Sequence, residues 1–174
     1  SKELIKDRMI KWRASDAITE VEKPLRLDKA RALGYKAKKG FFVVRIRLNR
    51  GGRKRPRHNH GRKSRKQHER KILKMSYQWV AEQRVEKKYS NLVVLNSYYL
   101  AKDGKHYFFE VIMVDPERPE IKNDSTINWI CRPENRKRAE RGLTTSAKKS
   151  RGLRTKSRNM KVRPSGRAWD RQGK

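Results

Sequence analysis

The sequence predicts an α+β protein in which helices pack on a small antiparallel sheet and long basic extensions become ordered only on a partner. Two observations carry this prediction. Residues 75–131 hold 7 basic and 8 acidic side chains, with 15 Leu, Ile, Val and Phe in 57 residues, enough apolar content for a folded core. The flanking segments 1–48, 49–74 and 132–174 carry net charges of +8, +11 and +13. Crowded like charges repel one another, so these flanks need a bound counter-charge.

Three strands are predicted from the spacing of apolar residues. Residues 42–48 alternate apolar side chains with Val, Arg and Arg, a period of two that gives one apolar and one partly basic face. Residues 92–100 and 106–114 are rich in β-branched and aromatic side chains. The Asp-Gly pair between them favours a tight turn, and Pro116 stops the last strand. These two strands should form a hairpin.

Helices are predicted before, between and after these strands along the sequence. Residues 64–88 contain no Gly or Pro and place apolar side chains at helical spacing, which predicts one long helix that is basic in its first half. Shorter helices suit residues 3–12, residues 28–33 with Asp28 as N-cap, and residues 133–141. The last two are each followed by a glycine, a common residue just past a helix end.

The charge blocks and the predicted elements suggest three regions. Residues 1–39 form a basic helical N-terminal segment, and residues 40–131 form the α+β core with a basic loop at 49–66. Residues 132–174 form a basic C-terminal helix and tail. From Thr144 onward no periodicity remains, and large apolar residues are few, so the tail should be extended and disordered when free.

The composition bounds the class of protein. Lys and Arg number 49 against 18 Asp and Glu among 174 residues, a net charge of +31 that points to a polyanionic partner. The lone Cys131 cannot form an internal disulfide, so a reducing compartment, the cytosol, is the simplest expectation. No stretch resembles a membrane span or a signal peptide, which argues against insertion and secretion.

The sharpest local motif is RGGRKRPR at residues 50–57. Its two glycines free the backbone for close approach, and the Arg side chains offer planar donors that match phosphate oxygens. A solvated basic loop or a nuclear-localisation signal is the plainer interpretation. The charge density favours a nucleic acid, and the lack of a recognition-helix or zinc-finger pattern favours RNA over DNA.

Metal binding and catalysis find little support. His58, His60 and His68 lie among a dozen cations with only one nearby acid, so a zinc site is not expected, and base stacking or phosphate contact suits the histidines better. Ser97 and Cys131 have no partner that the sequence could justify as a general base. The acids of the near-neutral segment have structural explanations in turns and strands. The sequence therefore predicts neither an enzyme nor a cofactor.

Five aromatic residues in the hairpin allow two interpretations. Tyr98, Tyr99, Tyr107, Phe108 and Phe109 could stack bases, as in single-strand binders. Because they lie among Val, Leu and Ile on paired strands, core packing is the favoured interpretation.

Several separated motifs resemble one known family. These are RLDKARALGYKAKKG at 26–40, the loop at 50–56, VLNSY at 94–98, YFFEVIMVDP at 107–116, and WI, RGLT and SRGL within 129–153. In order and spacing they resemble the L15e family of large-subunit ribosomal proteins of archaea and eukaryotes.

The resemblance implies a structural, non-catalytic protein with an antiparallel sheet and helices. Its expected partners are large-subunit rRNA, which threads around the basic extensions, and neighbouring ribosomal proteins, with no membrane, small-molecule substrate or metal. The family usually opens with an aromatic-rich helical segment that is not found before Lys2, so a truncated N-terminus is expected. The short C-terminus after Trp169 resembles archaeal members more than eukaryotic ones.

Rival interpretations are an RNA chaperone or DNA-compacting protein and, in another class, a metal-dependent nuclease. The candidate RNA-binding residues are cations of the basic segments and two histidines: Lys36, Lys38, Lys39, Arg45, Arg47, Arg50, Arg53, Lys54, Arg55, Arg57, His58, His60, Arg62, Lys63, Arg65, Lys66, Arg136, Arg138, Arg141, Lys148, Lys149, Arg151, Arg154 and Arg158.

Overall fold

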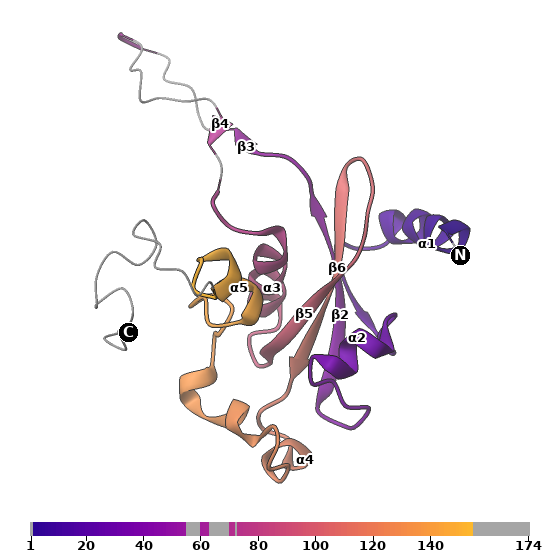
Figure 1. Ribbon diagram of the computed structural model, residues 1–174, viewed down its shortest axis with the longest axis vertical. Coiled ribbons are helices and arrows are strands. Elements are labelled where there is room, and N and C mark those ends of the chain that lie inside the picture. The colour runs from indigo at the N-terminus through magenta and orange to yellow at the C-terminus, as the bar shows by residue number, and fades with distance from the viewer. Residues whose placement is uncertain (1, 55–59, 63–69, 72, 155–174) are drawn as a thin grey trace.

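A computed structural model describes residues 2–54, 60–62, 70–71 and 73–154 of the chain (Figure 1). The helices are α1 Lys2–Ala14, α2 Leu27–Ala32, α3 Tyr77–Lys88, α4 Pro119–Lys122 and α5 Thr145–Ser150, with 3-10 turns η1 Asn128–Cys131 and η2 Pro133–Asn135. The strands are β1 Ile18–Val21, β2 Phe41–Asn49, β3 Arg53–Lys54, β4 Arg70–Lys71, β5 Val93–Lys102 and β6 His106–Val114. This arrangement confirms the α+β class with a small antiparallel sheet.

Four strands form the main sheet in the order β1-β2-β6-β5, and every neighbouring pair is antiparallel. β6 lies inside the sheet, and its residues from Phe108 to Val114 are all buried because both faces of the sheet are covered. The strand predicted over 42–48 and the hairpin predicted over 92–114 are confirmed. The predicted apolar face of β2 lies in the core, and the two Arg side chains of that strand lie on the opposite face.

Helices cover the two faces of the sheet (Figure 1). α3 packs on one face, where Val85 is fully buried against β2, β5 and β6. α2 and the α4–η1 segment cover the other face through Ala30 and Ile121. α1 packs beside the hairpin end, with the Trp12 and Phe108 ring centroids 5.3 Å apart. No helix in the described ranges is both long and apolar enough to span a bilayer.

The long helix predicted over 64–88 is wrong over residues 70–71 and 73–76. Among the described residues of this range only Tyr77–Lys88 is helical, and Arg70–Lys71 pairs with Arg53–Lys54 in a two-stranded ribbon. The remaining residues of the prediction, 64–69 and 72, lie outside the described ranges. Lys74 adopts a left-handed backbone with φ 58°, and Ser76 starts the helix by accepting a hydrogen bond from the Trp79 N–H at 3.3 Å.

Asp28 is not the N-cap of the second helix. α2 starts at Leu27, so Arg26 occupies the cap position without a side-chain cap bond. Asp28 lies in the first turn instead, 3.8 Å from the Arg26 guanidinium. An acid in the first turn stabilises the helix through the dipole, which accounts for the residue without a cap.

The helix predicted over 133–141 is also wrong. Only Pro133–Asn135 forms a 3-10 turn, because Lys137 adopts φ 52° and interrupts any helix there. The expectation of an extended tail from Thr144 fails at its start, since Thr144 caps α5 by accepting a hydrogen bond from the Ala147 N–H at 3.3 Å. The rest of the tail, residues 155–174, lies outside the described ranges.

Gly40 marks a close approach between β2 and α4. Its φ is +95°, and a Cβ placed there would lie 2.6 Å from Ile121 Cγ1. The position therefore excludes a side chain on two independent grounds. The Asp115 N–H donates to the Gly40 carbonyl at 2.9 Å, which ties the start of β2 to the end of β6.

Candidate nucleic-acid interface

The charged side chains that the fold buries are acids. The charged residues buried in the described ranges are all acids, namely Glu82, Glu86 and Glu110, and no Lys or Arg there is buried. Burying a carboxylate costs free energy unless hydrogen bonds compensate for the missing water. Each of the three therefore has a bonding role inside the protein, while the cations remain on the surface.

Glu82 of α3 joins the sheet to the C-terminal segment. Its two carboxylate oxygens accept hydrogen bonds from the hydroxyls of Ser97 on β5 and Thr144 before α5. Burial raises the pKa of Glu82, against the opposing effect of these hydroxyl groups and of Ser146. Gln78 adds a second link to β5 by donating to the Ser97 carbonyl at 2.9 Å.

Glu86, one helical turn further along α3, holds the chain that leads to α5. Its carboxylate accepts hydrogen bonds from the backbone N–H groups of Ala139 at 3.2 Å and Glu140 at 2.9 Å. Burial raises the pKa of Glu86, and the two backbone donors oppose that rise. The basic segment after residue 132 is thus bound to α3 by two buried acids.

Arg138 is a structural cation in that same segment. Its guanidinium donates to the backbone carbonyls of Val94 at 2.7 Å and Leu95 at 3.2 Å, and lies 4.9 Å from the Trp129 ring centroid. Burial lowers the pKa of Arg138, and the nearby Glu82 and Glu86 oppose this effect. Its predicted role in RNA binding is therefore weakened, because its donors already serve the sheet.

Glu110 is the buried acid on the opposite face of the sheet. It accepts hydrogen bonds from the Tyr98 hydroxyl and from the Leu25 backbone N–H at 3.1 Å, and it lies opposite Arg45 in the register. Burial raises the pKa of Glu110, against these partners. Its contacts fix the segment that leads from β1 into α2.

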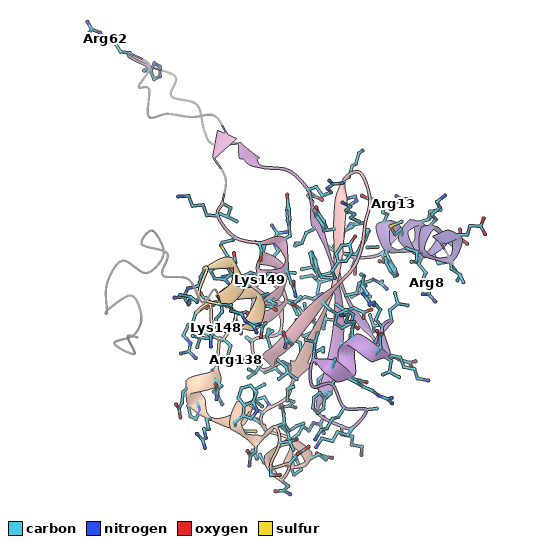
Figure 2. The ribbon with its side chains drawn as sticks, viewed as in Figure 1. Arg8, Arg13, Arg62, Arg138, Lys148 and Lys149 are labelled. Atoms are coloured by element: carbon cyan, nitrogen blue, oxygen red, sulfur yellow. The ribbon has the colours of Figure 1, made fainter. Side chains whose placement is uncertain are left out.

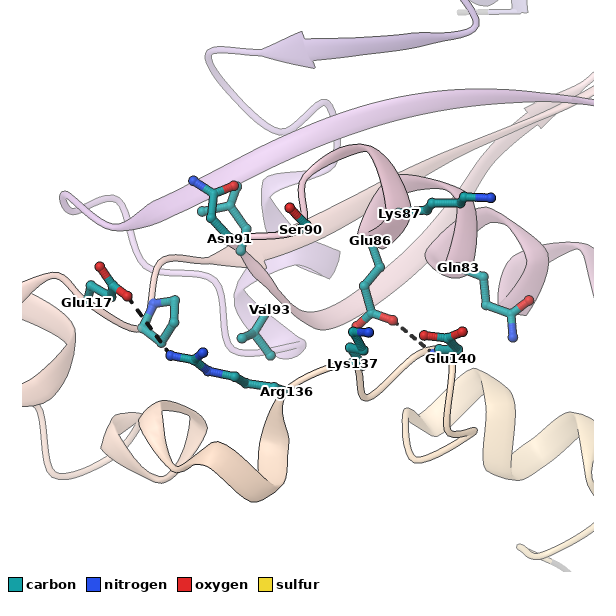
Figure 3. A pocket seen from close by; sticks show the side chains of 12 residues that line it. Gln83, Glu86, Lys87, Ser90, Asn91, Val93, Glu117, Arg136, Lys137 and Glu140 are labelled. Atoms are coloured by element: carbon teal, nitrogen blue, oxygen red, sulfur yellow. Dashed lines mark hydrogen bonds and ion pairs between the residues drawn. The ribbon is translucent and has the colours of Figure 1, made fainter.

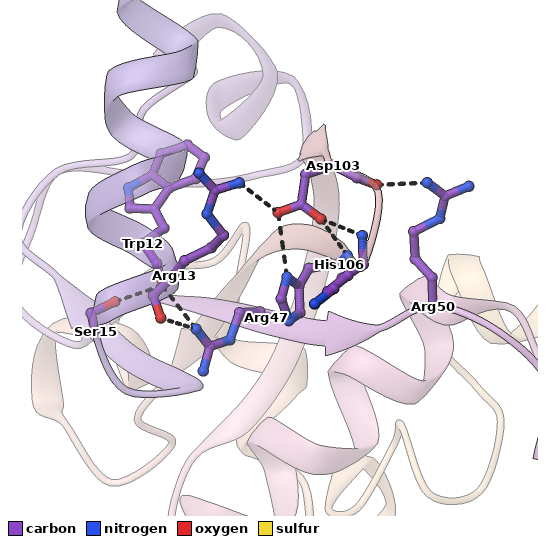
Figure 4. Close-up of polar contacts among 8 residues, drawn as sticks. Trp12, Arg13, Ser15, Arg47, Arg50, Asp103 and His106 are labelled. Atoms are coloured by element: carbon purple, nitrogen blue, oxygen red, sulfur yellow. Dashed lines mark hydrogen bonds and ion pairs between the residues drawn. The ribbon is translucent and has the colours of Figure 1, made fainter.

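Two predicted RNA-binding residues, Arg45 and Arg47, hold α1 in place. The Arg45 guanidinium lies 5.1 Å from the Trp12 ring centroid. Arg47 donates to the carbonyls of Trp12 and Arg13, which lie in the last turn of α1, where carbonyls lack an N–H partner within the helix (Figure 4). Both Arg side chains come from the partly basic face of β2, so this face supports a helix and is not free for RNA.

The hairpin turn adds a third contact to α1 (Figure 4). Asp103 lies 3.3 Å from the Arg13 guanidinium and accepts backbone hydrogen bonds from Lys105 and His106. Although burial opposes the shift, these donors hold the pKa of Asp103 at about 2. Arg50 donates to the Asp103 carbonyl at 2.6 Å and lies 5.1 Å from the Tyr107 ring centroid.

The predicted basic loop begins as a narrow ribbon that projects from the body (Figure 1). Its strands are Arg53–Lys54 and Arg70–Lys71, which pair in antiparallel register. Arg62 is exposed and lies further from the sheet than β3 and β4 do (Figure 2). The ribbon therefore carries basic residues well away from the sheet.

Lys36 and Lys38 share one acid. Their ammonium groups lie 2.7 Å and 2.6 Å from Asp124 Oδ2, and Lys38 also donates to the Glu120 carbonyl at 2.9 Å. The two ammonium groups hold the pKa of Asp124 well below its usual range. The neighbouring Lys39 is exposed and takes part in no ion pair with a described residue.

The C-terminal cations divide into braced and unbraced side chains. Arg141 donates to the carbonyls of Glu134 and Arg136, and Arg151 donates to the Gly142 carbonyl at 3.0 Å. The unbraced side chains are exposed and form no ion pair within the described ranges. Among the predicted site residues they are Lys148 and Lys149 on α5 (Figure 2), and Arg154 just after it.

An open groove of about 720 Å³ runs between the end of α3, the 116–117 segment and the 136–140 segment (Figure 3). Arg136 lies 4.0 Å from Glu117 across it. The ionisable lining residues are three cations and three acids, Lys87, Arg136, Lys137, Glu86, Glu117 and Glu140. This balance gives the groove no preference for a polyanion.

The hairpin aromatics are divided between the two interpretations. Tyr98, Phe108 and Phe109 are buried, so core packing is confirmed for them. Tyr99 keeps 40% of its surface exposed, and Tyr107 is half-buried. The core interpretation therefore does not cover the whole set.

A family model described as Ribosomal L15 matches residues 1–169. The chain belongs to this family. Ribosomal L15e proteins are components of the large subunit of the cytoplasmic ribosome, with roles in translation and rRNA binding, and ribosomal protein families are generally structural rather than enzymatic. The resemblance seen in the sequence motifs is thus confirmed over nearly the whole chain.

In this L15e protein the predicted site residues do not form one patch. The described ones lie mainly in four places. These are the ribbon, the surroundings of Asp124, the face of β2 that contacts α1, and the C-terminal segment. Seven others lie outside the described ranges, namely Arg55, Arg57, His58, Lys63, Arg65, Lys66 and Arg158, as does His68. Among the described residues no group of three or more potential metal ligands occurs.

Sequence reasoning missed the buried acids of this L15e protein. Glu82 and Glu86 lie one turn apart on α3, and their sequence context resembles an ordinary solvated helix face. One signal was available: both acids lie next to apolar residues of the helix, Ala81 and Val85, that face the core. An acid in such a position is rarely buried without a hydrogen-bond partner.

Proposed function

We propose that this L15e protein binds and stabilises folded large-subunit rRNA through exposed Arg and Lys side chains, without catalysis and without a cofactor. The observation that carries the proposal is that three acids are buried in bonding roles, whereas no Lys or Arg whose burial is described is buried. A protein of net charge +31 with this surface needs a dense polyanion to neutralise it.

The unbraced cations are proposed as the phosphate contacts. Lys39, Arg62, Lys148, Lys149 and Arg154 are exposed, and within the described ranges none takes part in an ion pair. The braced cations, such as Arg47 and Arg138, instead build the surfaces that carry them. Neighbouring ribosomal proteins are the second class of partner implied by the family.

The proposed mechanism is neutralisation and shape. Arg and Lys displace counterions from closely packed phosphates, which lets RNA helices approach one another. Contacts to phosphates fix position and carry no sequence information, so direct base reading should be minor. We also propose that the core of residues 40–131 remains folded while the flanking basic segments become fully ordered on RNA.

Cosedimentation with large subunits tests the proposal. We expect the full chain to remain with large subunits at salt concentrations that remove a DNA-compacting protein or an RNA chaperone, which should bind many duplexes indifferently. A nuclease would instead cleave RNA and lose that activity with a chelator. Release from large subunits at moderate salt, or chelator-sensitive cleavage, would contradict the proposal.

A loop variant adds a quantitative test. Replacing Arg53, Lys54 and Arg55 with Ala should shallow the slope of log affinity against log salt by about 0.7–0.9 for each phosphate that the variant no longer neutralises. The core should stay folded, because Arg53 and Lys54 lie outside the main sheet and Arg55 lies outside the described ranges. An unchanged slope would remove this loop from the interface.

A further inference from the structure

An aromatic and cationic cluster lies on the α3 side of the sheet, at the hairpin end. Tyr99 on the edge strand β5 lies opposite Phe109, and Lys102 lies opposite Tyr107. Because β5 is at the edge of the sheet, no strand covers it on its far side. Tyr99 is 40% exposed and Lys102 is exposed.

The contacts of Tyr99 fix its ring. Its centroid lies 5.9 Å from that of Phe109 and 6.4 Å from that of Tyr107, with interplanar angles of 70° and 65°. In these edge-on contacts the neighbouring rings set the orientation of Tyr99 without stacking on it. The exposed ring surface is therefore held in place before any partner arrives.

Arg50 brings a cation to the same cluster. Its guanidinium lies 5.1 Å from the Tyr107 centroid and is held by the Asp103 carbonyl, while its backbone N–H donates to the Lys105 carbonyl at 2.8 Å. Tyr77, whose ring lies 4.7 Å from that of Tyr107, fixes the start of the basic ribbon through two hydrogen bonds with Gly51. The ring surface thus lies beside the root of the ribbon.

We propose that Tyr99, with Arg50 and Lys102 beside it, is a stacking site for one unpaired base of RNA. An aromatic face can stack on any base, and adjacent cations match the phosphates on either side of an unstacked nucleotide. The described ranges show no ion pair for Arg50 or Lys102, so their positive charge is not neutralised by an acid there. This charge favours a nucleic acid as the ligand of the exposed ring. This inference rests on the proposed rRNA-binding function and adds a base contact to a mode that otherwise uses phosphates.

The test compares two RNAs of equal length with the full chain. One is a fully paired duplex, and the other carries a three-nucleotide bulge with 2-aminopurine at its centre. The variants are Tyr99→Leu, which keeps an apolar side chain without a π face, and Tyr99→Phe as the matched control. We expect Tyr99→Leu to weaken binding of the bulged RNA roughly 5- to 100-fold and binding of the duplex less than twofold.

Three further readouts accompany the affinities. Tyr99→Phe should bind both RNAs as the wild type does, and wild-type binding should quench the 2-aminopurine fluorescence. The salt slope of Tyr99→Leu should match the wild type because every cation near the phosphates is kept, whereas Lys102→Gln should shallow it. Ultraviolet crosslinking of the wild-type protein to the bulged RNA should modify Tyr99, a readout that needs no variant to fold.

The outcomes separate this inference from the proposed function. If Tyr99→Leu binds the bulged RNA as tightly as the wild type, or loses affinity equally for both RNAs, the stacking site is wrong while rRNA binding stands. A wild-type protein that binds neither RNA and does not cosediment with large subunits would overturn both. Absence of a Tyr99 crosslink in a bound complex would overturn the stacking site alone.

Discussion

Glu86 on α3 accepts a hydrogen bond from the backbone N–H of Glu140, 54 residues later in the chain, at 2.9 Å. The chain has a net charge of +31 and therefore many cations with which an acid could pair. Within the described residues, Glu86 instead accepts hydrogen bonds from the protein's own backbone. Two N–H groups satisfied by one buried carboxylate make a strong link, because hydrogen bonds to charged groups exceed neutral ones. The C-terminal segment is therefore attached to the core by hydrogen bonds within the protein.

Replacing Glu86 with Ala should detach this segment. The change leaves the N–H groups of Ala139 and Glu140 without their acceptor, which should lower the free energy of unfolding by about 1–3 kcal/mol. Hydrogen exchange at these two amides should speed up. The matched control is Glu140→Gln, which alters an exposed side chain and should leave exchange unchanged. Equal exchange in Glu86→Ala and the wild type would show that the link carries no free energy.

The pH dependence of stability should report Glu82. Burial raises its pKa in the folded protein above the ordinary value of 4.5, so the folded state holds the proton more tightly than the unfolded state. Its contribution is fully present below pH 4.5 and disappears as the pH rises through the raised pKa.

A comparison with Glu82→Gln isolates this effect from the other titrating groups. Denaturant unfolding at a series of pH values should show the difference in unfolding free energy shifting in favour of the variant as the pH rises from 4.5. A difference that stays constant across this range would mean that Glu82 titrates normally in the folded state.

The sequence predicted β2 and the β5–β6 hairpin of the sheet correctly, because the residues that determine them are close together in the chain. The alternation in residues 42–48 and the Asp-Gly turn each lie within ten residues, and both appear in the structure. The prediction of a long basic helix failed just before Tyr77, because the pattern cannot show that Lys74 adopts a left-handed backbone and that Ser76 starts a helix. A start signal inside a continuous periodic pattern is the feature that the prediction missed.

The candidate site was harder to predict because the role of a cation depends on the group that its side chain contacts in the folded protein. Arg47 and Arg138 look like RNA-binding residues in the sequence, yet backbone carbonyls 34 and 44 residues away hold their guanidinium groups. Lys36 is paired with Asp124, 88 residues later. Only the fold decides which cations remain for an external anion.

Arg47 should therefore matter more for α1 than for RNA. Arg47→Ala removes a donor to the carbonyls of Arg13 and Trp12, of which the second keeps the Ser15 hydroxyl as a donor. The change should cost about 1 kcal/mol in stability and speed exchange in the last turn of α1. Arg31→Ala removes the same charge from an exposed position and serves as the control. If both variants were equally stable, Arg47 would not be anchoring the helix.

Ion pairing should decide which lysines release counterions on binding. The ammonium groups of Lys148 and Lys149 have no acidic partner within the described ranges, whereas those of Lys36 and Lys38 lie within 2.7 Å of Asp124. A phosphate contact by an unpaired lysine displaces a condensed counterion, but a lysine that already neutralises an acid contributes less.

Two double variants with the same change in charge separate these cases. Replacing Lys148 and Lys149 with Gln should shallow the slope of log affinity against log salt for large-subunit rRNA by about 1.4–1.8, using about 0.7–0.9 per phosphate. Replacing Lys36 and Lys38 with Gln should shallow it by less than half as much, because ammonium groups held on Asp124 reach fewer phosphates directly. Equal slopes for the two variants would mean that total charge, rather than pairing within the fold, governs how this protein binds RNA.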